Sequence, residues 1–495
     1  MKGGLVLVLM AGVIAVYAQA PDVDPRFHTY GEVCDEVAAL AESHPEICRV
    51  ETLAYSTQDS VPIIGVIISD NVDEYEDESA ILIVAGQHAR EPLGTEASMW
   101  LINYLMENYG TDPRVTEWVD SFNIVFVPVD NPEGRNVVME PGPEHTLWWR
   151  KNKHDNNGNG VFDTLYDGVD PNRNYDYRWE EYGGTDPGSE YYKGEHPWSE
   201  AESRLVRDLV DSLRPAVVMD LHSPDSVGGN KLWFCWYDSS AHSYHQGGFP
   251  HYYDVALQLA AHTETEVDGE YYVARPANNI KPKLQLWIYW YSGACAILME
   301  ITNKCFWHGD TIDTIAARVG RGITYMFDRM LEKGLIVRTY DSENDVPLRA
   351  EVIIDGVTDT TFPARLCGYN GRYHRLLYPG TYTVRVRYRG TEQVFENVEI
   401  VEGENTYLNV DFPGAAVRES NFEPPDIKID LLPAQVEFWA PAGTAEIFDI
   451  VGRRVFSAQF EGKLVVNRGN FSPGVYFARL SAGKCLINKK FVVIK

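Results

Sequence analysis

The sequence predicts an α/β domain with a mixed, largely parallel sheet flanked by helices, followed by two small all-β sandwich modules. Apolar strand-like runs alternate with amphipathic helical stretches from about residue 24 to 333, a pattern typical of a sheet covered by helices. Two of the runs, 81–85 and 216–221, are almost continuously apolar, as expected for strands buried on both faces. After residue 334 the pattern changes to short alternating strands separated by glycine-containing turns.

The expected strands, helices and modules can each be assigned to a range of residues. In the first domain the expected strands are 62–68, 81–85, 123–129, 216–221 and 294–299, and the expected helices are 94–108, 199–213, 251–261 and 311–331. Residues 334–412 predict a β-sandwich with strands at 335–340, 350–354, 381–388 and 397–401. The proline-containing stretch 413–433 has no helical period and is expected to be a linker. In the last module, 434–495, cations outnumber carboxylates, unlike the rest of the chain.

Length, composition and charge restrict the class of function. The 495 residues suffice for about three domains with buried cores. An aromatic content of 12% argues against intrinsic disorder. The formal net charge of −29 repels nucleic-acid phosphates and anionic lipid surfaces. We therefore expect a soluble ligand or a polypeptide as partner, and no nucleic acid.

Residues 1–20 have the pattern of an export signal. Lys2 precedes an apolar stretch from Leu5 to Val16, and Ala18-Gln19-Ala20 is a small-x-small cleavage site. A membrane anchor is the alternative, but this stretch and every later apolar run are shorter than the ~20 residues of a spanning helix. The seven cysteines are odd in number, scattered and without a C-x-x-C pair, which excludes a disulfide scaffold and argues against a thiolate zinc site. The sequence thus predicts a secreted or cell-surface protein, cleaved after Ala20 and without a transmembrane segment.

Potential metal ligands follow the expected strands, where open α/β sheets place ligand sites. His88 and Glu91 follow strand 81–85, and their spacing of three lets both side chains converge on one cation. His222 follows strand 216–221 and would complete a His-Glu-His zinc set with an open fourth position. For His88 and Glu91 alone, the alternative is a surface turn in which Glu91 forms a salt bridge. For His222 alone, the alternative is a hydrogen-bonded histidine at the edge of the sheet. Glu300 follows strand 294–299, where an unpaired carboxylate would cost several kcal/mol in a dry site, so we expect a salt bridge or a catalytic task.

These residues resemble the M14 zinc carboxypeptidase family over most of residues 24–333. The resemblance rests on five motifs in the family's order and spacing: His88-Ala89-Arg90-Glu91, Trp149-Arg150-Lys151, Asp170-Pro171-Asn172-Arg173-Asn174-Tyr175, His222-Ser223 and Leu298-Met299-Glu300.

The resemblance implies that His88, Glu91 and His222 bind zinc and that Asp170 orients His88. It also implies that Glu300 is the general base, which takes a proton from water and later passes it to the leaving amine.

Four further residues receive roles from the same resemblance. Arg150 would stabilise the oxyanion. Asn172 and Arg173 would hold the terminal carboxylate of the substrate, since a guanidinium binds a carboxylate in a bidentate way. Arg90 would help line the substrate cleft. For Asn172-Arg173 an exposed turn is the alternative.

One segment departs from the family pattern. The family carries a mobile tyrosine ahead of the catalytic glutamate, then a Gly-rich segment and an Asp-Trp-x-Tyr-like stretch, whereas residues 277–289 here read ANNIKPKLQLWIY. Tyr271 or Tyr272 is the candidate substitute. Because the floor of the family's specificity pocket comes from this segment, the preferred side chain of the substrate stays open.

A calcium loop is a second metal prediction. Asp155, Asn157, Asn159 and Asp163 place oxygen side chains at alternate positions, and a glycine stands at the sixth position. The twelfth position holds Tyr166 instead of an acidic ligand, and an Asn-Gly-rich turn is the alternative.

The two β modules also resemble known types. Residues 334–412, above all 371–373 and 378–382, resemble the carboxypeptidase regulatory-like, prealbumin-type sandwich. Residues 434–495 resemble type IX secretion sorting domains, through the motifs at 448–455, 472–476 and 489–491. A plain adhesion module is the alternative for the last one.

The sequence therefore predicts a secreted zinc metallocarboxypeptidase that acts on peptide or protein C-termini and is exported through its C-terminal module. A cell-wall peptide amidase or peptidase of the same fold is one alternative, and a non-catalytic secreted binding protein is another. Glu300 and Arg150 together argue against the binding protein, which needs no general base.

Overall fold

The computed structural model describes residues 18–495, apart from 75, 225–227, 235–236, 239–242, 245–247, 278–281, 345, 359–362, 416–427, 432–434, 450–453, 468–470, 472–473, 483–484 and 494–495. The chain divides into two compact units, Met1–Pro413 and Gly414–Lys495. Most of the predicted export signal, residues 1–17, lies outside the described residues. Within the described part of the chain, no helix is both long and apolar enough to cross a membrane.

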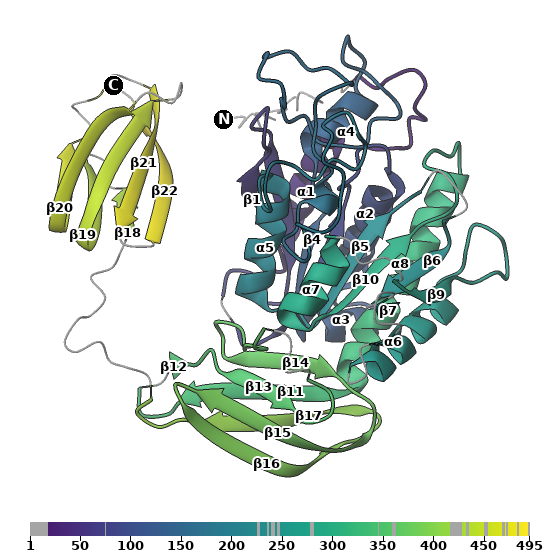
Figure 1. Ribbon diagram of the computed structural model, residues 1–495, viewed down its shortest axis with the longest axis vertical. Coiled ribbons are helices and arrows are strands. Elements are labelled where there is room, and N and C mark those ends of the chain that lie inside the picture. The colour runs from purple at the N-terminus through teal and green to yellow at the C-terminus, as the bar shows by residue number, and fades with distance from the viewer. Residues whose placement is uncertain are drawn as a thin grey trace, which may run out of the picture. The chain divides into compact units, whose positions relative to one another are not determined.

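An eight-stranded mixed sheet forms the centre of the first unit (Figure 1). Its order is β1-β2-β4-β3-β5-β10-β6-β9, and the adjacent strands β4, β3, β5 and β10 run parallel. Antiparallel pairs β1–β2, β2–β4 and β10–β6 flank them, which confirms the predicted fold class. The strands are β1 (Cys48–Tyr55), β2 (Pro62–Ile68), β3 (Ser79–Ala85), β4 (Phe122–Val127), β5 (Val217–His222), β6 (Lys231–Phe234), β9 (Val273–Pro276) and β10 (Cys295–Glu300), with a small separate pair β7 (Tyr237–Asp238) and β8 (Ser243–Tyr244).

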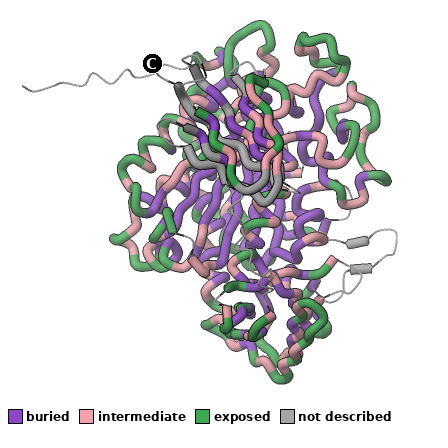
Figure 2. Tube along the Cα trace, turned by 90° about the vertical axis from the view of Figure 1, so that its left-hand side faces the viewer, coloured by how far each residue is buried: buried purple, intermediate pink, exposed green. Residues whose placement is uncertain are grey.

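Helices cover both faces of this sheet, and Figure 2 shows its strands as the buried interior of the unit. Ile81 and Ile83 of β3 belong to the core cluster on one face, with α1, α2, α6 and α8, whereas Leu82 and Val84 belong to the cluster on the other face, with α5 and α7. Burial on both faces explains why β3 is apolar throughout. The helices are α1 (Tyr30–Ser43), α2 (Leu93–Asn108), α3 (Pro113–Val119), α4 (Pro132–Met139), η1 (Pro171–Arg173), α5 (Ala201–Leu213), α6 (Phe249–His262), α7 (Leu284–Ser292) and α8 (Thr311–Glu332).

Helix α7 occupies the segment in which the sequence departs from the family pattern. Its side chains face both cores, with Leu284 and Trp287 in one cluster and Leu286 in the other. A helix that is apolar all round is buried and shows no amphipathic period. The helix ends at Gly293, whose left-handed φ of 76° suits glycine.

Residues 333–412 form two small sheets in the same compact unit. One has the order β12-β11-β14, with β17 paired to β11, and the other has the order β13-β15-β16. Arginines from this part bond to α7: Arg365 donates to the carbonyl of Trp290, and Arg375 donates to the carbonyl of Gly293. The strands are β11 (Lys333–Asp341), β12 (Val346–Pro347), β13 (Glu351–Ile354), β14 (Arg372–Leu376), β15 (Gly380–Tyr388), β16 (Thr391–Ile400) and β17 (Glu404–Asp411).

The second unit is a five-stranded antiparallel sheet around a core that includes Phe438 and Ile447. Its first strand, β18, lies inside the interval 413–433 that the sequence predicts to be a linker, and it pairs with β19. The strands are β18 (Lys428–Leu431), β19 (Gln435–Asp449), β20 (Arg454–Asn467), β21 (Gly474–Ala482) and β22 (Cys485–Val493).

Candidate active site

Three neighbouring parallel strands, β3, β5 and β10, bring the predicted metal and catalytic residues to one edge of the sheet. His222 and Glu300 end adjacent strands and are direct register partners. After β3 the chain turns at Gly86, whose φ of 67° is left-handed, and a Cβ there would lie 3.1 Å from the Cα of Val129. This turn directs His88 and Glu91 toward the end of β5.

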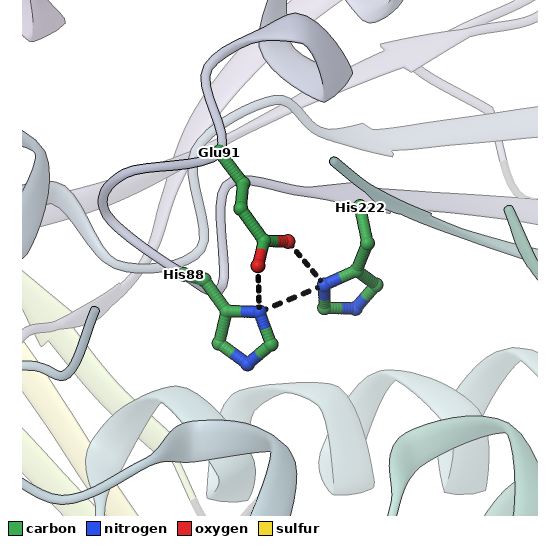
Figure 3. A group of neighbouring side chains, drawn as sticks. All are labelled: His88, Glu91 and His222. Atoms are coloured by element: carbon green, nitrogen blue, oxygen red, sulfur yellow. Dashed lines mark hydrogen bonds and ion pairs between the residues drawn. The ribbon is translucent and has the colours of Figure 1, made fainter. Parts of the chain in front are cut away.

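His88, Glu91 and His222 converge on one point (Figure 3). The Nδ1 atom of His88 lies 2.9 Å from Oε1 of Glu91, and the Nδ1 atom of His222 lies 2.9 Å from Oε2 of the same carboxylate. The two Nδ1 atoms are 3.0 Å apart. In a tetrahedral zinc site the ligand atoms are about 2.0–2.2 Å from the metal and hence about 3.3–3.6 Å from one another. The donor set therefore fits zinc, and the ligand atoms lie a few tenths of an ångström closer together than a bound zinc ion would hold them.

In each histidine the second ring nitrogen, Nε2, contacts a buried carboxylate. His88 Nε2 lies 3.1 Å from Asp170 Oδ1, and His222 Nε2 lies 2.8 Å from Asp220 Oδ1. When Nε2 donates its proton to a carboxylate, the lone pair stays on Nδ1, where a metal can take it. Sequence reasoning missed Asp220. Its signal is an acidic residue inside an apolar strand, two positions before His222 and thus on the same face.

The charges around the metal set are strongly coupled. Burial alone would raise the pKa of Glu91, but His88 and His222 lower it well below its ordinary value. Burial lowers the pKa of His222, yet Asp220 and Glu91 outweigh burial and raise it to about 10. Zinc requires a deprotonated histidine, so zinc binding should release a proton from His222 at neutral pH.

Replacing Asp220 with Asn is expected to weaken zinc binding by about 10- to 100-fold, because the orientation and basicity of His222 depend on this carboxylate. Proton release on zinc binding should also decline in the variant, because the pKa of His222 falls without Asp220. Calorimetry in buffers of different ionisation enthalpy measures both quantities. Asp208→Asn, at an exposed position on α5, is the control. Zinc affinity and proton release equal to those of the wild type would show that Asp220 does not tune His222.

A cavity of about 180 Å³ opens beside the metal set. Its lining contains His88, Arg90, Glu91, Arg150, Asn172, Arg173, Tyr191, His222, Pro224, Lys283, Leu298 and Glu300. The structure therefore brings together all the predicted zinc-binding, catalytic and substrate-binding residues, with Asp170 directly behind them.

Glu300 lies at the end of β10, partly buried and close to the metal set. Burial and the charge of Glu91 raise its pKa to about 7, although His222, Lys283 and Arg150 act in the opposite direction. A carboxyl group with this pKa can exchange a proton near neutral pH.

Arg150 is fixed by two carboxylates. Its Nη2 donates to Asp170 at 2.9 Å, and its Nη1 donates to Glu91 at 3.3 Å. Burial opposes the charged form, but Asp170 and Glu91 raise the pKa of Arg150 above its ordinary value. The cavity wall thus carries a rigid, permanent positive charge.

Asn172 and Arg173 lie in the short helix η1, which is capped by the side chain of Asp170. Arg173 is 5% exposed, and no described carboxylate lies within ion-pair distance of it. Its Nη1 donates to the carbonyl of Asn172 at 2.6 Å, and the ring of Tyr191 lies 5.4 Å from its guanidinium carbon. A buried guanidinium without a counter-ion is prepared to bind an anion.

Arg90 is placed differently from Arg173. It lines the cavity, but its guanidinium is paired with Glu190 at 2.7 Å and 3.2 Å and also donates to the carbonyl of Trp148 at 3.0 Å. Its charge is thus largely neutralised by Glu190, and Arg90 forms part of the wall.

The predicted substitute tyrosines lie outside this cavity lining. Tyr271 is exposed and Tyr272 is buried, and neither lines the cavity. Residues 278–281 lie outside the described residues. Sequence reasoning missed Tyr191, which lines the cavity and stacks near both Arg150 and Arg173.

The structure gives no support to the calcium prediction. The carboxylate of Asp155 accepts hydrogen bonds from the backbone of Gly158, Asn159 and Gly160. The amide nitrogen of Asn157 donates to Asp163 at 3.0 Å, and the side-chain oxygen of Asn159 accepts from the backbone of Val161. An Asn-Gly-rich turn that satisfies its own polar groups accounts for these contacts.

Comparison with known proteins agrees with this geometry. Residues 33–305, more than half of the chain, match the family model described as zinc carboxypeptidase. Residues 426–495 match the secretion system C-terminal sorting domain, the type IX module, which marks the protein for secretion or the cell surface.

Individual relatives are similar over part of their length. The chain is 31% identical over 200 residues to carboxypeptidase B of Helicoverpa zea, which covers 40% of this chain and 44% of that protein. It is also 31% identical over 190 residues to carboxypeptidase A2 of Rattus norvegicus, a match that covers 38% of this chain and 42% of that protein. The chain thus spans less than half the length of these relatives.

Solved structures show the same fold. Carboxypeptidase A from Helicoverpa armigera superposes with a TM-score of 0.50 at 20% identity, over 60% of this chain and 72% of that one. A second similar structure is bovine thrombin-activatable fibrinolysis inhibitor in complex with tick carboxypeptidase inhibitor. It gives a TM-score of 0.50 at 19% identity and covers 61% of this chain and 96% of that one. With the His88, Glu91 and His222 metal site in place, the chain belongs to the zinc carboxypeptidase family.

Proposed function

We propose that the protein is a secreted zinc metallocarboxypeptidase that hydrolyses the last peptide bond of peptides and proteins. The observation that carries this proposal is the buried guanidinium of Arg173, which has no described carboxylate partner and lies in the same cavity as the metal set and Glu300. Such a cation suits the carboxylate that only the end of a chain provides.

Glu300 is proposed as the general base. Zinc, when bound, lowers the pKa of a water molecule and polarises a carbonyl group. With its pKa near 7, Glu300 accepts the proton of the attacking water and delivers it to the leaving amine.

Arg150 is proposed to stabilise the oxyanion. Its guanidinium is held by Asp170 and faces the cavity, so it needs no reorganisation when charge develops on the substrate. Asp170 thus serves two positioning functions, because it also orients His88.

Asn172 and Arg173 are proposed to hold the substrate's terminal carboxylate. The backbone N–H of Leu284 donates to Asn172 Oδ1 at 2.8 Å, which fixes this side chain against the start of α7. The cavity of about 180 Å³ lies below the range of about 300–1,000 Å³ typical of drug-sized ligands. A single terminal residue suits a space of this size.

Peptides that differ only in a free or an amidated C-terminus test the proposal. The zinc-loaded protein should release the last residue of the free acid and leave the amide intact. Arg173→Met should lower kcat/KM for the free acid by roughly 30-fold or more, mainly through KM, because the substrate carboxylate loses a buried charged partner. Mass spectrometry and steady-state kinetics provide the readouts.

The half-buried Arg178, which is paired with Glu181 and lies outside the cavity lining, offers the matched control Arg178→Met. Equal hydrolysis of the amidated peptide, or cleavage at internal bonds, would contradict an exopeptidase. Binding of peptides without any release would favour the non-catalytic binding protein.

The division of the chain follows from the same proposal. We assign catalysis to residues 24–333, a regulatory-like sandwich to 334–412 and contact with the export machinery to 434–495. The sorting-domain match at 426–495 supports the last assignment and extends it toward β18.

A further inference from the structure

The charges that line the cavity are unevenly distributed. Four cationic side chains line it, Arg90, Arg150, Arg173 and Lys283, together with two carboxylates, Glu91 and Glu300. Glu190 pairs with Arg90, and Asp170 pairs with Arg150. The proposed function uses Glu91 for the metal, Glu300 for proton transfer and Arg173 for the terminal carboxylate, and it gives Lys283 no role.

Lys283 is held close to the substrate clamp. It is the residue immediately before α7, and its carbonyl accepts the backbone N–H of Trp287 at 3.0 Å in the first helical turn. The next residue, Leu284, donates its backbone N–H to Asn172 at 2.8 Å. Lys283 also acts electrostatically on Glu300. Lys283 therefore lines the cavity together with the clamp and the general base.

The remaining lining offers little to an apolar or basic substrate side chain. Pro224 and Leu298 are the apolar aliphatic residues in the lining, and both lining carboxylates already have tasks. A basic side chain would meet Arg173, Lys283 and the zinc charge, and like charges in a confined site repel strongly.

We propose that Lys283 binds the side-chain carboxylate of a C-terminal glutamate or aspartate, while Arg173 binds the main-chain carboxylate of the same residue. Each of the two cations then receives one of the two carboxylates that such a residue carries. The inference rests on the proposed function, because it assigns the substrate class of the same cavity.

Four peptides that differ only in the last residue, Glu, Gln, Leu or Lys, test this inference. Glutamine has the shape of glutamate without its charge, so the ratio of kcat/KM for Glu over Gln isolates the ionic contact. We expect a ratio of about 10- to 100-fold in the zinc-loaded protein, as for a hydrogen bond to a charged group. Lys283→Met should bring the ratio close to one, Lys283→Arg should preserve most of it, and Lys283→Glu should favour the Lys peptide.

The exposed Lys304 lies outside the cavity lining and gives the matched control Lys304→Met, which should keep the wild-type ratio. Because the readout is a ratio within each variant, a partly unfolded preparation does not imitate the effect. Equal cleavage of the Glu and Gln peptides by the wild type, or an undiminished ratio in Lys283→Met, would overturn the inference and leave the carboxypeptidase activity standing.

Calorimetry with N-acetyl-glutamate and N-acetyl-glutamine separates this inference from the proposed function. Both compounds resemble the last residue of a peptide with its amide bond, and they require no catalysis to bind. If no peptide is trimmed but N-acetyl-glutamate binds better and loses its advantage in Lys283→Met, the recognition stands and the hydrolytic function fails. Equal binding of the two compounds overturns the recognition.

Discussion

Removal of zinc by a chelator is expected to reduce peptide hydrolysis to the uncatalysed background, and added zinc should restore it. His222→Ala should not recover, because the variant lacks one of three converging ligands and leaves Glu91 with a single histidine partner. The expected loss is the largest of any change described for this protein, since the metal supplies both the activated water and the polarised carbonyl.

Metal content by elemental analysis and hydrolysis of a free-acid peptide are the two measurements. His308→Ala is the control, because the side chain of His308 is 77% exposed and outside the cavity lining. It should retain both zinc and activity. Full activity in a preparation shown to be free of zinc would rule out the metal-dependent mechanism.

Glu300→Gln is expected to lower kcat by about 10²- to 10⁴-fold while zinc content stays unchanged. Glutamine fills the same space at the end of β10 but cannot take a proton. In the wild type, kcat/KM should rise as the pH increases through about 7, because the base must be deprotonated and the pKa of Glu300 is raised to about 7 by burial and Glu91. This acid limb should be absent from the residual activity of the variant.

Glu181→Gln, which changes an exposed carboxylate paired with Arg178, is the matched control and should keep the acid limb. Elemental analysis checks that zinc is retained in both variants. Wild-type kcat in Glu300→Gln at full zinc occupancy would exclude Glu300 as the base and assign proton transfer to another group.

The positions that the sequence could predict are those tied to strand ends. His88, His222 and Glu300 each follow an apolar run, and parallel strands that are neighbours in the sheet bring their ends together. Their convergence is therefore a consequence of local pattern and topology. For Arg150, Asn172 and Arg173, the motif resemblance supplied the expectation, and the structure places all three in the cavity lining.

The residues that the sequence did not reveal depend on tertiary contacts. Tyr191 comes from an irregular loop with no periodic pattern, and only the fold brings its ring near Arg150 and Arg173. Lys283 looks like a solvated cation until α7 is recognised. That helix escaped prediction because most of Leu284–Ser292 is buried, with side chains in both cores, and lacks an amphipathic period.

The arginines at the end of α7 join residues 333–412 to the helix that begins beside the cavity. Arg365 donates to the carbonyl of Trp290, and the carbonyl of Gly293 accepts from both Arg375 and the hydroxyl of Tyr252. A hydrogen bond to a charged group contributes about 1.5–3 kcal/mol. The opposite end of the same helix carries Lys283 and the bond to Asn172. A fragment cut after α8 would keep every proposed metal ligand, and we expect it to hold α7 less firmly because these arginine bonds are lost. We therefore expect a fragment that extends to Phe412 to be more stable than one that ends after α8.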